Sequence, residues 1–304
     1  MLRRLLQWRW SPMSDDKAPD GGYPTVTSVE LGEQSPTSLR DITTIAYTEY
    51  RLAVRNRWAL ALTVIFAAFS LGLVTFSGSN VGPAGFERVL GSLTVLAVYL
   101  VPLAALAFGY DAIVGSEDSG WLQAIFALPI ARWRIVLGTY LGRSVAMVGA
   151  IIIGFGAAGA LLLRDFGTGG WDGFMVFMLA AAALSLVFLS IAMLLSTIVS
   201  EKTHALGGSL LVWAWFILVH DLIALGMIAA FRLPNVVLDA MIVSNPAGVF
   251  RVLVLDSLEA GGDSGFAAMM AATGLSTPVL IAALLVWIVL PLALAGWLIS
   301  RRRL

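Results

Sequence analysis

Residues Val89–Phe108 read VLGSLTVLAVYLVPLAALAF, a run of twenty residues without a charged side chain. A helix needs roughly 20 apolar residues to cross the hydrocarbon core of a bilayer, so this run predicts a membrane span. The composition agrees, because 59% of the 304 residues are hydrophobic and 12% are charged, whereas a soluble domain is about half apolar and a quarter charged. The formal net charge is zero, which argues against the basic surface of a nucleic-acid-binding protein.

Five more runs before and after it have the same character, which gives six predicted spans in all. The six runs are Trp58–Phe76, Val89–Phe108, Ile135–Leu163, Phe174–Ile198, Ala205–Phe231 and Pro278–Ile299. The third run contains Arg143, which we place near the membrane interface, where a long side chain can reach water. The sequence therefore predicts an all-α polytopic membrane protein.

The first 38 residues differ from the rest, because they are rich in Ser, Pro, Gly, Thr and charged side chains. A segment of this composition buries too little apolar surface to fold, so residues 1–38 are predicted to form a disordered cytoplasmic tail. A short interfacial anchor at Leu5–Trp10 is the alternative. Residues 39–304 are expected to form the transmembrane domain. Its first part, Leu39–Arg57, has apolar residues three and four apart, which predicts an amphipathic helix on the cytoplasmic membrane surface.

The positive charges between the spans predict the orientation, because cytoplasmic loops of membrane proteins carry an excess of lysine and arginine. With the N-terminus inside, eleven such residues of the transmembrane domain lie in the cytoplasm and four lie outside. The inside set is Arg40, Arg51, Arg55, Arg57, Arg132, Arg134, Arg143, Lys202, Arg301, Arg302 and Arg303, and the outside set is Arg88, Arg164, Arg232 and Arg251. A multi-pass protein of the cell membrane with both termini in the cytoplasm is therefore expected, and the loop Arg232–Thr277 then lies outside.

The segment between the second and third runs, Tyr110–Arg134, reads YDAIVGSEDSGWLQAIFALPIARWR. We expect Gly115 to end the helix of the second span and Pro129 to end a short new helix. A helix that lies among anionic headgroups usually carries lysine or arginine, and this one carries none between Ser119 and Ile130. A protein partner in the cytoplasm is therefore favoured over a helix that only rests on the membrane. The apolar face of this coupling helix comprises Trp121, Leu122, Ile125 and Phe126.

Two polar residues, His220 and Asp221, fall in the middle of the fifth run. Charged groups at that depth are expensive and usually face an interior or a water-filled path. The sequence predicts either a functional polar lining or a structural hydrogen bond to Thr94, Tyr99 or Ser185, and both interpretations stay open.

Small residues gather on the third run, at Gly138, at Gly142 and in the stretch GFGAAGA (Gly154–Ala160). Small side chains let helices approach closely, so these positions predict helix contacts. Contacts within the chain are favoured over a seam between two copies.

The predicted outer loop contains Asn245-Pro246 followed by Gly248, which indicates a turn before a short apolar helix, Val249–Leu258. Ten residues or so are too few to cross a bilayer. Contact with an external partner and plain re-entrant packing are both consistent with this pattern.

Four stretches carry a family resemblance. They are IAYTEYRLAVRNRW (Ile45–Trp58), YDAIVGSEDSGWLQAIFALPIARWRIVLGTYLG (Tyr110–Gly142), VHDLIAL (Val219–Leu225) and SNPAGVFRVLVL (Ser244–Leu255). In this order, and with six spans around them, the chain resembles the ABC-2 class of ABC-transporter permeases. Within that class it is most similar to the NosY-type permeases of the NosDFY system. The resemblance covers roughly residues 40–303.

The resemblance implies two copies of the chain, each docked to a separate ATPase subunit of the NosF kind through the N-terminal amphipathic helix and the coupling helix. It also implies an external β-helical protein of the NosD kind. The ATPase would bind ATP and magnesium, while this permease subunit would bind no cofactor or metal and would have no catalytic residue. The system serves the maturation of nitrous oxide reductase, to which copper or a sulfur species is delivered. In agreement, the sequence contains no GxxxxGK[ST] motif for nucleotide phosphates.

The candidate residues fall into three groups. Those expected to couple to the ATPase are Glu49, Arg55, Arg57, Asp111, Glu117, Trp121, Leu122, Ile125, Phe126 and Pro129. The intramembrane polar pair is His220 and Asp221, and the expected contacts to an outer partner are Asn245, Pro246, Phe250 and Arg251. Two other functions remain open: an ABC-2 exporter of a lipid, drug or glycan precursor, and an ATP-independent membrane channel or scaffold.

Overall fold

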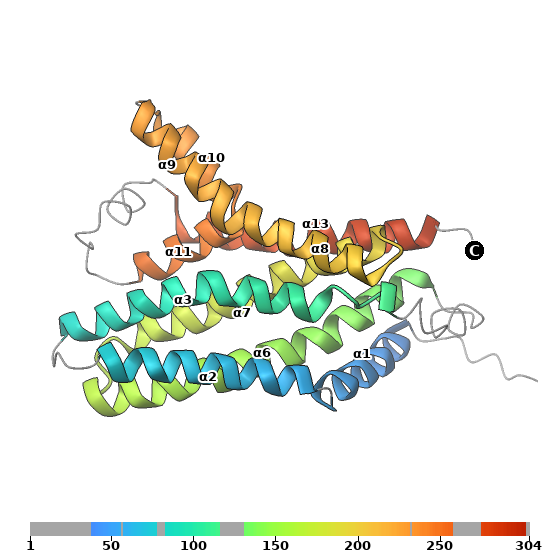
Figure 1. Cartoon of the computed structure of the whole chain (residues 1–304), viewed down its shortest axis with the longest axis horizontal. Coiled ribbons are helices and arrows are strands. Elements are labelled where there is room, and N and C mark those ends of the chain that lie inside the picture. Colours follow the sequence, from blue (N-terminus) through green and yellow to red (C-terminus); the bar gives the residue numbers. More distant parts are fainter. Residues whose placement is uncertain are drawn as a thin grey trace, which may run out of the picture. The chain divides into compact units, whose positions relative to one another are not determined.

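The computed structural model describes residues 38–55, 57–77, 83–115, 131–231, 233–257 and 275–301, and within these ranges no residue lies in a β-strand. The helices are α1 (Ser38–Arg55), α2 (Arg57–Ser77), α3 (Pro83–Gly109), α6 (Arg132–Phe166), α7 (Trp171–Ile198), α8 (Lys202–Ala214), the π-helix η1 (Trp215–Val219), α9 (His220–Ala230), α10 (Asn235–Val243), α11 (Pro246–Asp256) and α13 (Thr277–Arg301). Residues 38–304 group into one compact unit, whose helices are drawn in Figure 1.

The six predicted spans are confirmed. In the described part of the chain, six helices are long and apolar enough to cross a membrane: α2, α3, α6, α7, the continuous α8–η1–α9 and α13. Most of these helices extend beyond the predicted apolar runs, because hydropathy marks the part in hydrocarbon while the helix continues into the headgroups. The helix of the second span ends at Gly109 rather than at the predicted Gly115, because residues 110–113 form a turn.

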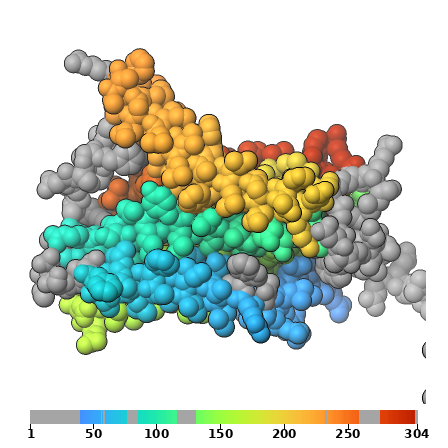
Figure 2. All heavy atoms as spheres, viewed as in Figure 1, coloured from blue at the N-terminus to red at the C-terminus, as the bar shows by residue number. Residues whose placement is uncertain are grey.

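Helix α7 lies at the centre of the bundle, where it contacts α3, α6, α11 and α13. In the most apolar stretch of α7, 61% of the residues are buried. In the corresponding stretch of α8–η1–α9, 11% of the residues are buried. A row of aromatic rings runs through this core: Phe66 and Phe155 have centroids 5.3 Å apart, Phe155 and Phe177 also 5.3 Å, and Phe177 and Phe250 6.2 Å. The rings tie α2, α6, α7 and α11 together, whereas α8–η1–α9 presents much of its apolar surface outward (Figure 2).

Glycines on α6 allow the predicted close packing within the chain. A Cβ at Gly154 would collide with the Cβ of Phe66 on α2, and one at Gly159 would enter the ring of Phe174 on α7. The hydroxyl of Ser70 on α2 also donates to the Gly154 carbonyl over 3.0 Å. Only the absence of a side chain at these positions permits such approaches.

Helices α10 and α11 form an apolar pair that bends by 109° and could be one broken span or a re-entrant loop. The sequence predicted Val249–Leu258 as the short helix, and the observed α11 begins three residues earlier because Pro246 occupies its first turn and Asn245 caps it. Helix α10 lies in what was predicted to be loop. Val249 and Phe250 are fully buried, so α11 packs into the bundle rather than resting on its surface.

Candidate functional site

The first candidate site centres on Arg143, on α6. Its Nη1 donates to Asp111 Oδ1 over 2.7 Å and to the Phe108 carbonyl over 2.6 Å, and its Nε lies 3.6 Å from Glu49 Oε2. We call Glu49, Phe108, Asp111 and Arg143 the Arg143 cluster. It joins α1, the end of α3 and α6, which are far apart in the sequence.

The charge balance of the Arg143 cluster is unequal, because one guanidinium faces two carboxylates. Asp111 is partly open to solvent, with 42% of its side chain exposed, while Glu49 is buried, with 8% exposed. Burial raises the pKa of Glu49 above its ordinary value; Arg143 opposes this and Asp111 adds to it. The ion pair of Glu49 with Arg143 therefore does not fully offset the desolvation of the Glu49 carboxylate.

Helix α1 lies along the first half of α6 with no room between the backbones. A Cβ at Gly142 would come within 2.7 Å of the Glu49 Cβ and 2.9 Å of the Tyr50 nitrogen. One turn earlier, a Cβ at Gly138 would meet the Ile45 side chain at 2.8 Å. The salt bridge of Asp41 with Arg134, at 3.0 Å, closes the start of this contact. The pairs advance together along both helices, so α1 and α6 run parallel.

The start of the predicted coupling segment is held by α7 as well. The hydroxyl of Ser196 accepts hydrogen bonds from the backbone nitrogens of Ile113 at 3.0 Å and Val114 at 3.1 Å. Asp111 is thus fixed between Arg143 and a capped turn. Arg55 and Arg57 are exposed where α1 meets α2. The other predicted coupling residues, Glu117, Trp121, Leu122, Ile125, Phe126 and Pro129, lie outside the described residues.

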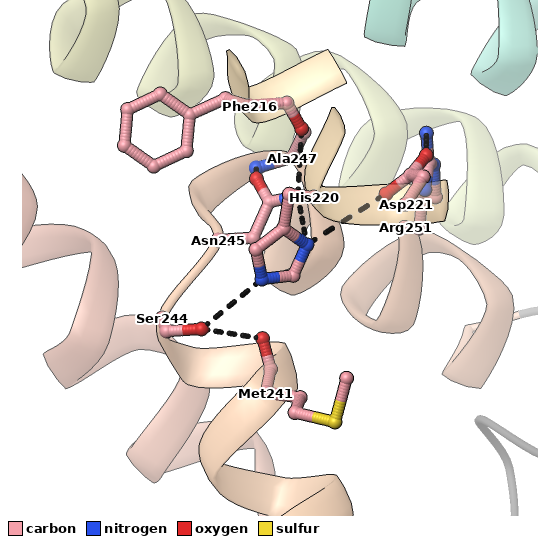
Figure 3. A network of polar contacts seen from close by, with 8 residues as sticks. All are labelled: Phe216, His220, Asp221, Met241, Ser244, Asn245, Ala247 and Arg251. Carbon is pink, nitrogen blue, oxygen red and sulfur yellow. Dashed lines mark hydrogen bonds and ion pairs between the residues drawn. The ribbon is translucent and has the colours of Figure 1, made fainter. Parts of the chain in front are cut away.

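The second candidate site surrounds Asn245 at the break between α10 and α11 (Figure 3). The Asn245 Oδ1 accepts from the Ala247 nitrogen over 3.0 Å, and its Nδ2 lies 2.9 Å from the Phe216 carbonyl and 3.1 Å from His220 Nδ1. We call Phe216, His220, Ser244 and Asn245 the Asn245 network. It joins the fifth span to the bent pair of α10 and α11.

The π-helix η1 explains why the Phe216 carbonyl can take part. The His220 nitrogen bonds to the Trp215 carbonyl, five residues back, rather than to Phe216 four residues back. The Phe216 carbonyl then receives the amide of Asn245. A π-turn in a membrane helix requires such outside partners, because lipid offers no hydrogen bonds.

The Asn245 network also fixes the proton on His220. The Asn245 amide is oriented by two backbone partners, so its Nδ2 faces His220 Nδ1, which must accept. The proton is then on Nε2, which donates to Ser244 Oγ over 3.2 Å, and the Ser244 hydroxyl donates to the Met241 carbonyl over 2.8 Å. Both ring nitrogens are occupied, so the network holds a neutral imidazole in place.

Asp221 points to a different partner from its neighbour. Its Oδ2 lies 2.7 Å from Arg251 Nη2 on α11, while its Oδ1 is 3.9 Å from His220 Nδ1. The predicted hydrogen-bond partners, Thr94, Tyr99 and Ser185, are wrong: Thr94 and Ser185 donate to carbonyls of their own helices. Sequence reasoning could not foresee the true partners because they lie at the bend between α10 and α11 and on α11.

The structure places the remaining predicted outer contacts inside the protein. Asn245, Pro246 and Phe250 are buried, and Arg251 is paired with Asp221. Sequence reasoning gave no site role to two residues that organise these sites. It placed Arg143 only near the membrane interface, and it quoted Ser244 only as part of a stretch that resembles the family. Arg143 had a usable signal, because an arginine in an apolar run with acids on two neighbouring helices is seldom left unpaired. Ser244 had none. Among the described residues, no group of three or more His, Asp or Glu side chains could hold a metal ion.

Apolar helices packed around α7, with polar clusters where helices meet, define a multi-pass α-helical membrane protein. The family described as ABC-2 family transporter protein matches residues 43–304, so the chain belongs to this family of ABC-transporter permeases, which are generally non-catalytic membrane subunits. It is 35% identical over 276 residues to the probable ABC transporter permease protein NosY of Pseudomonas aeruginosa, covering 85% of this chain and 98% of that relative. It is also 35% identical over 277 residues to the probable ABC transporter permease protein NosY of Stutzerimonas stutzeri, covering 88% of this chain and 100% of that relative.

Proposed function

We propose that this ABC-2 permease couples ATP hydrolysis by a separate ATPase subunit to movement of its membrane helices, in the service of nitrous oxide reductase maturation. The cargo would be copper or a sulfur species, or the subunit would transmit force to an outer partner. Similarity to NosY over nearly the whole length of both relatives supports this assignment. ATP and magnesium would be bound by the partner, which we expect to resemble NosF.

The observation that carries the proposed coupling is the Arg143 cluster. Two residues expected from sequence to serve coupling, Glu49 and Asp111, meet on one guanidinium. A displacement of the segment after Asp111 would therefore be transmitted to α1 and α6 together. Because ion pairs and tight backbone contacts join these elements, they would move as one body.

A second copy of the chain is part of the proposal. The α8–η1–α9 helix is long enough to span the membrane, yet only 11% of its most apolar window is buried within one chain. Lipid can cover such a surface, and so can another copy. The family resemblance favours a homodimer in which some of this surface is shared.

At the other end we propose that α10 and α11 support an external partner of the NosD kind. Because Asn245, Pro246 and Phe250 are buried, their role would be to hold α11 in place and not to touch the partner. Arg251, paired with Asp221, would anchor α11 to the fifth span. An ABC-2 exporter of a lipid, drug or glycan precursor would use the same coupling, and the similarity to NosY favours the maturation role over it.

Co-expression with an ATPase subunit of the NosF kind from the same organism tests the proposal. We expect the ATPase to co-purify with the tagged permease, and Trp121→Glu to abolish the complex, while Thr168→Glu, in the exposed turn between α6 and α7, leaves it intact. Retention of the ATPase by Trp121→Glu, or no ATPase in either case, contradicts ATPase coupling through this segment and favours a channel or scaffold.

The maturation role needs its own experiment. A strain without this gene should make nitrous oxide reductase that lacks its catalytic copper–sulfur centre, as read from its absorption spectrum, and the wild-type gene should restore it. A normal spectrum in the deleted strain contradicts the maturation role but leaves the ABC-permease function standing.

A further inference from the structure

The start of the fifth span lies against the residues that follow α3, positions 110–115, which we call the 110–115 turn. A Cβ at Gly115 would lie 3.3 Å from the Cε of Lys202, the first residue of α8, and 3.8 Å from the Asp111 Cγ. A separation of 3.3 Å is tighter than ordinary van der Waals contact, so the Lys202 side chain passes directly over Gly115. The absence of a side chain at Gly115 therefore leaves the space that Lys202 occupies beside Asp111.

The inner side of the 110–115 turn is fixed to the bundle. Ser196 on α7 accepts hydrogen bonds from the backbone nitrogens of Ile113 at 3.0 Å and Val114 at 3.1 Å, and both of these residues are buried. The open side of the turn carries Asp111, 42% of whose side chain is exposed. Lys202 lies on this open side. The turn is therefore joined to α7 by hydrogen bonds and meets the fifth span through a single long side chain.

Helix α8 meets the bundle along a narrow seam, and Lys202 extends this seam. The buried residues of α8 are Ala205 and Ser209, three and seven positions after Lys202, so all three side chains project from one face of the helix. Helix α8 contacts α3 and α7, but only 11% of the most apolar stretch of the fifth span is buried within the chain. Because so few contacts within the chain hold this span, each of them has a large share in setting its position.

The charge of the Arg143 cluster favours a cation at the position of Lys202. One guanidinium faces the carboxylates of Glu49 and Asp111, which leaves a formal excess of one negative charge. The Lys202 Cε and the Asp111 Cγ lie within 4 Å of the same point, so the ammonium group of Lys202 is placed to offset this excess. Lys202 is exposed and Asp111 is partly exposed, so water screens their attraction and keeps it weak. A weak contact of this kind can form and break as the turn moves.

We propose that Lys202 is a positioning residue that transmits movement of the 110–115 turn to the fifth span, through the contact of its side chain with Gly115 and Asp111. The inference rests on the proposed function, because it takes the ATPase as the source of that movement. The Arg143 cluster transmits the same movement to α1 and α6, so Lys202 adds a second route. Movement of the fifth span would then reach α10 and α11, because Asn245 joins them to the span at Phe216 and His220.

The response of two helices to nucleotide tests this second route. Thr43→Cys on α1 and His204→Cys on α8 are exposed positions, and each reports on its own helix. The rate of maleimide labelling is measured in the complex with an ATPase subunit of the NosF kind in nanodiscs, with and without ATP trapped by vanadate. We expect trapping to change the rate at both cysteines. Lys202→Ala should reduce the change at His204→Cys about threefold, the effect of one exposed ion pair on an equilibrium, and preserve the change at Thr43→Cys.

Two further variants separate positioning from folding. Lys202→Arg keeps the reach and the charge, so it should restore the response at His204→Cys. Glu201→Ala removes the neighbouring charge, whose side chain does not cap α8, and should leave the response unchanged. An unchanged response in Lys202→Ala, an equal loss at Thr43→Cys, or no rescue by Lys202→Arg would overturn the inference alone. No response at either cysteine without these changes would contradict the ATPase coupling itself, and the inference with it.

A substitution at Gly115 tests the contact itself. Gly115→Leu should fill the space beside Asp111 and displace the Lys202 side chain, because a Cβ there already lies 3.3 Å from the Lys202 Cε. We expect the response at His204→Cys to fall as in Lys202→Ala, and to fall no further in the double variant, because both changes remove one contact. Gly149→Leu is the matched control, since a Cβ at Gly149 on α6 meets nothing within 4 Å. Additive losses in the double variant, or an undiminished response in Gly115→Leu, would refute the contact.

Discussion

Asn245 shows how one side chain can satisfy three groups that the membrane leaves without partners. Its oxygen caps α11, and its amide nitrogen serves both the Phe216 carbonyl and His220 Nδ1. Asn245→Ala would leave all three groups without their hydrogen-bond partner. Since a buried polar group without a partner costs about 1–3 kcal/mol, we expect the free energy of unfolding to fall by roughly 3 kcal/mol.

Thermal unfolding in detergent measures this effect. The control is Asn235→Ala, because Asn235 is exposed at the start of α10, and its Tm should match wild type. An Asn245→Ala protein as stable as the control would mean that water or a backbone shift replaces the lost hydrogen bonds.

Glu49 leads to a prediction about pH. Burial raises its pKa in the folded protein, so the folded state binds the proton more tightly than the unfolded state. Its contribution to stability is therefore complete below the ordinary pKa of a glutamate and decreases as the pH rises through the raised pKa. Glu49→Gln cannot ionise, so its Tm relative to wild type should increase from acidic to neutral pH.

The comparison is made by scanning fluorimetry across a series of buffers. Arg143→Gln should lower the Tm at every pH, because it leaves Glu49 without its cation and Asp111 without its donor. If Glu49→Gln instead loses stability against wild type as the pH rises, the attraction to Arg143 outweighs the desolvation.

At the level of single residues, the sequence located polar groups but not their partners. His220 and Asp221 were found because charge is rare in an apolar run, whereas Asn245 was assigned to a turn in an outer loop. Their meeting depends on how α11 folds back into the bundle and on a π-turn in the fifth span. Neither has a period that hydropathy can detect, because a single π-turn shifts the pattern by one residue only.

At the level of elements, the contact of α1 with α6 depends on backbone closeness. Alanine usually stabilises a helix by up to about 1 kcal/mol over glycine, but a Cβ at Gly142 would collide with the α1 backbone. We expect Gly142→Ala to displace α1 and lower the Tm. In contrast, Gly149→Ala, on the same helix and open, should be neutral or slightly stabilising.

Trypsin sensitivity within α1, at Arg40 and Arg51, distinguishes displacement from a general loss of stability. It should increase in Gly142→Ala and stay unchanged in Gly149→Ala. Equal behaviour of the two variants would show that α1 accommodates the added methyl group by sliding along α6.

The elements themselves were largely predictable. Six spans follow from six apolar runs, since a bilayer demands length and hydrophobicity of every crossing segment. Helix α10 was not predicted, because nine mostly apolar residues after a proline are compatible with a loop, a strand or a helix. Its helical form depends on contact with α11, and Trp287 of α13 donates to the Val243 carbonyl at its end over 3.0 Å.

At the level of the whole molecule, the Arg143 cluster predicts a coupling defect without a folding defect. Asp111→Asn keeps the shape of the side chain but weakens its bond to Arg143. With a co-expressed ATPase, we expect the complex to assemble normally while permease-dependent ATPase activity falls several-fold. Asp165→Asn, whose carboxylate is 4.0 Å from Arg164 in an exposed pair, should keep full activity. Loss of assembly in Asp111→Asn would place Asp111 in docking rather than in transmission.

At this scale, charge predicts the orientation of the molecule in the membrane, and a labelling experiment tests it. With α10 and α11 as a re-entrant loop, six spans would place both termini on one side. The arginines of α1, those at the start of α6 and those at the end of α13 predict that this side is the cytoplasm. The chain has no cysteine, so single cysteines can be introduced without background. Thr43→Cys on α1 and His204→Cys on α8 are exposed positions of the predicted cytoplasmic side, and Thr168→Cys is exposed on the other. A membrane-impermeant maleimide should label only Thr168→Cys in intact spheroplasts, and all three variants after lysis. Labelling of Thr43→Cys before lysis would show that the topology is the opposite of the predicted one. The Arg143 cluster would then lie out of reach of a cytoplasmic ATPase.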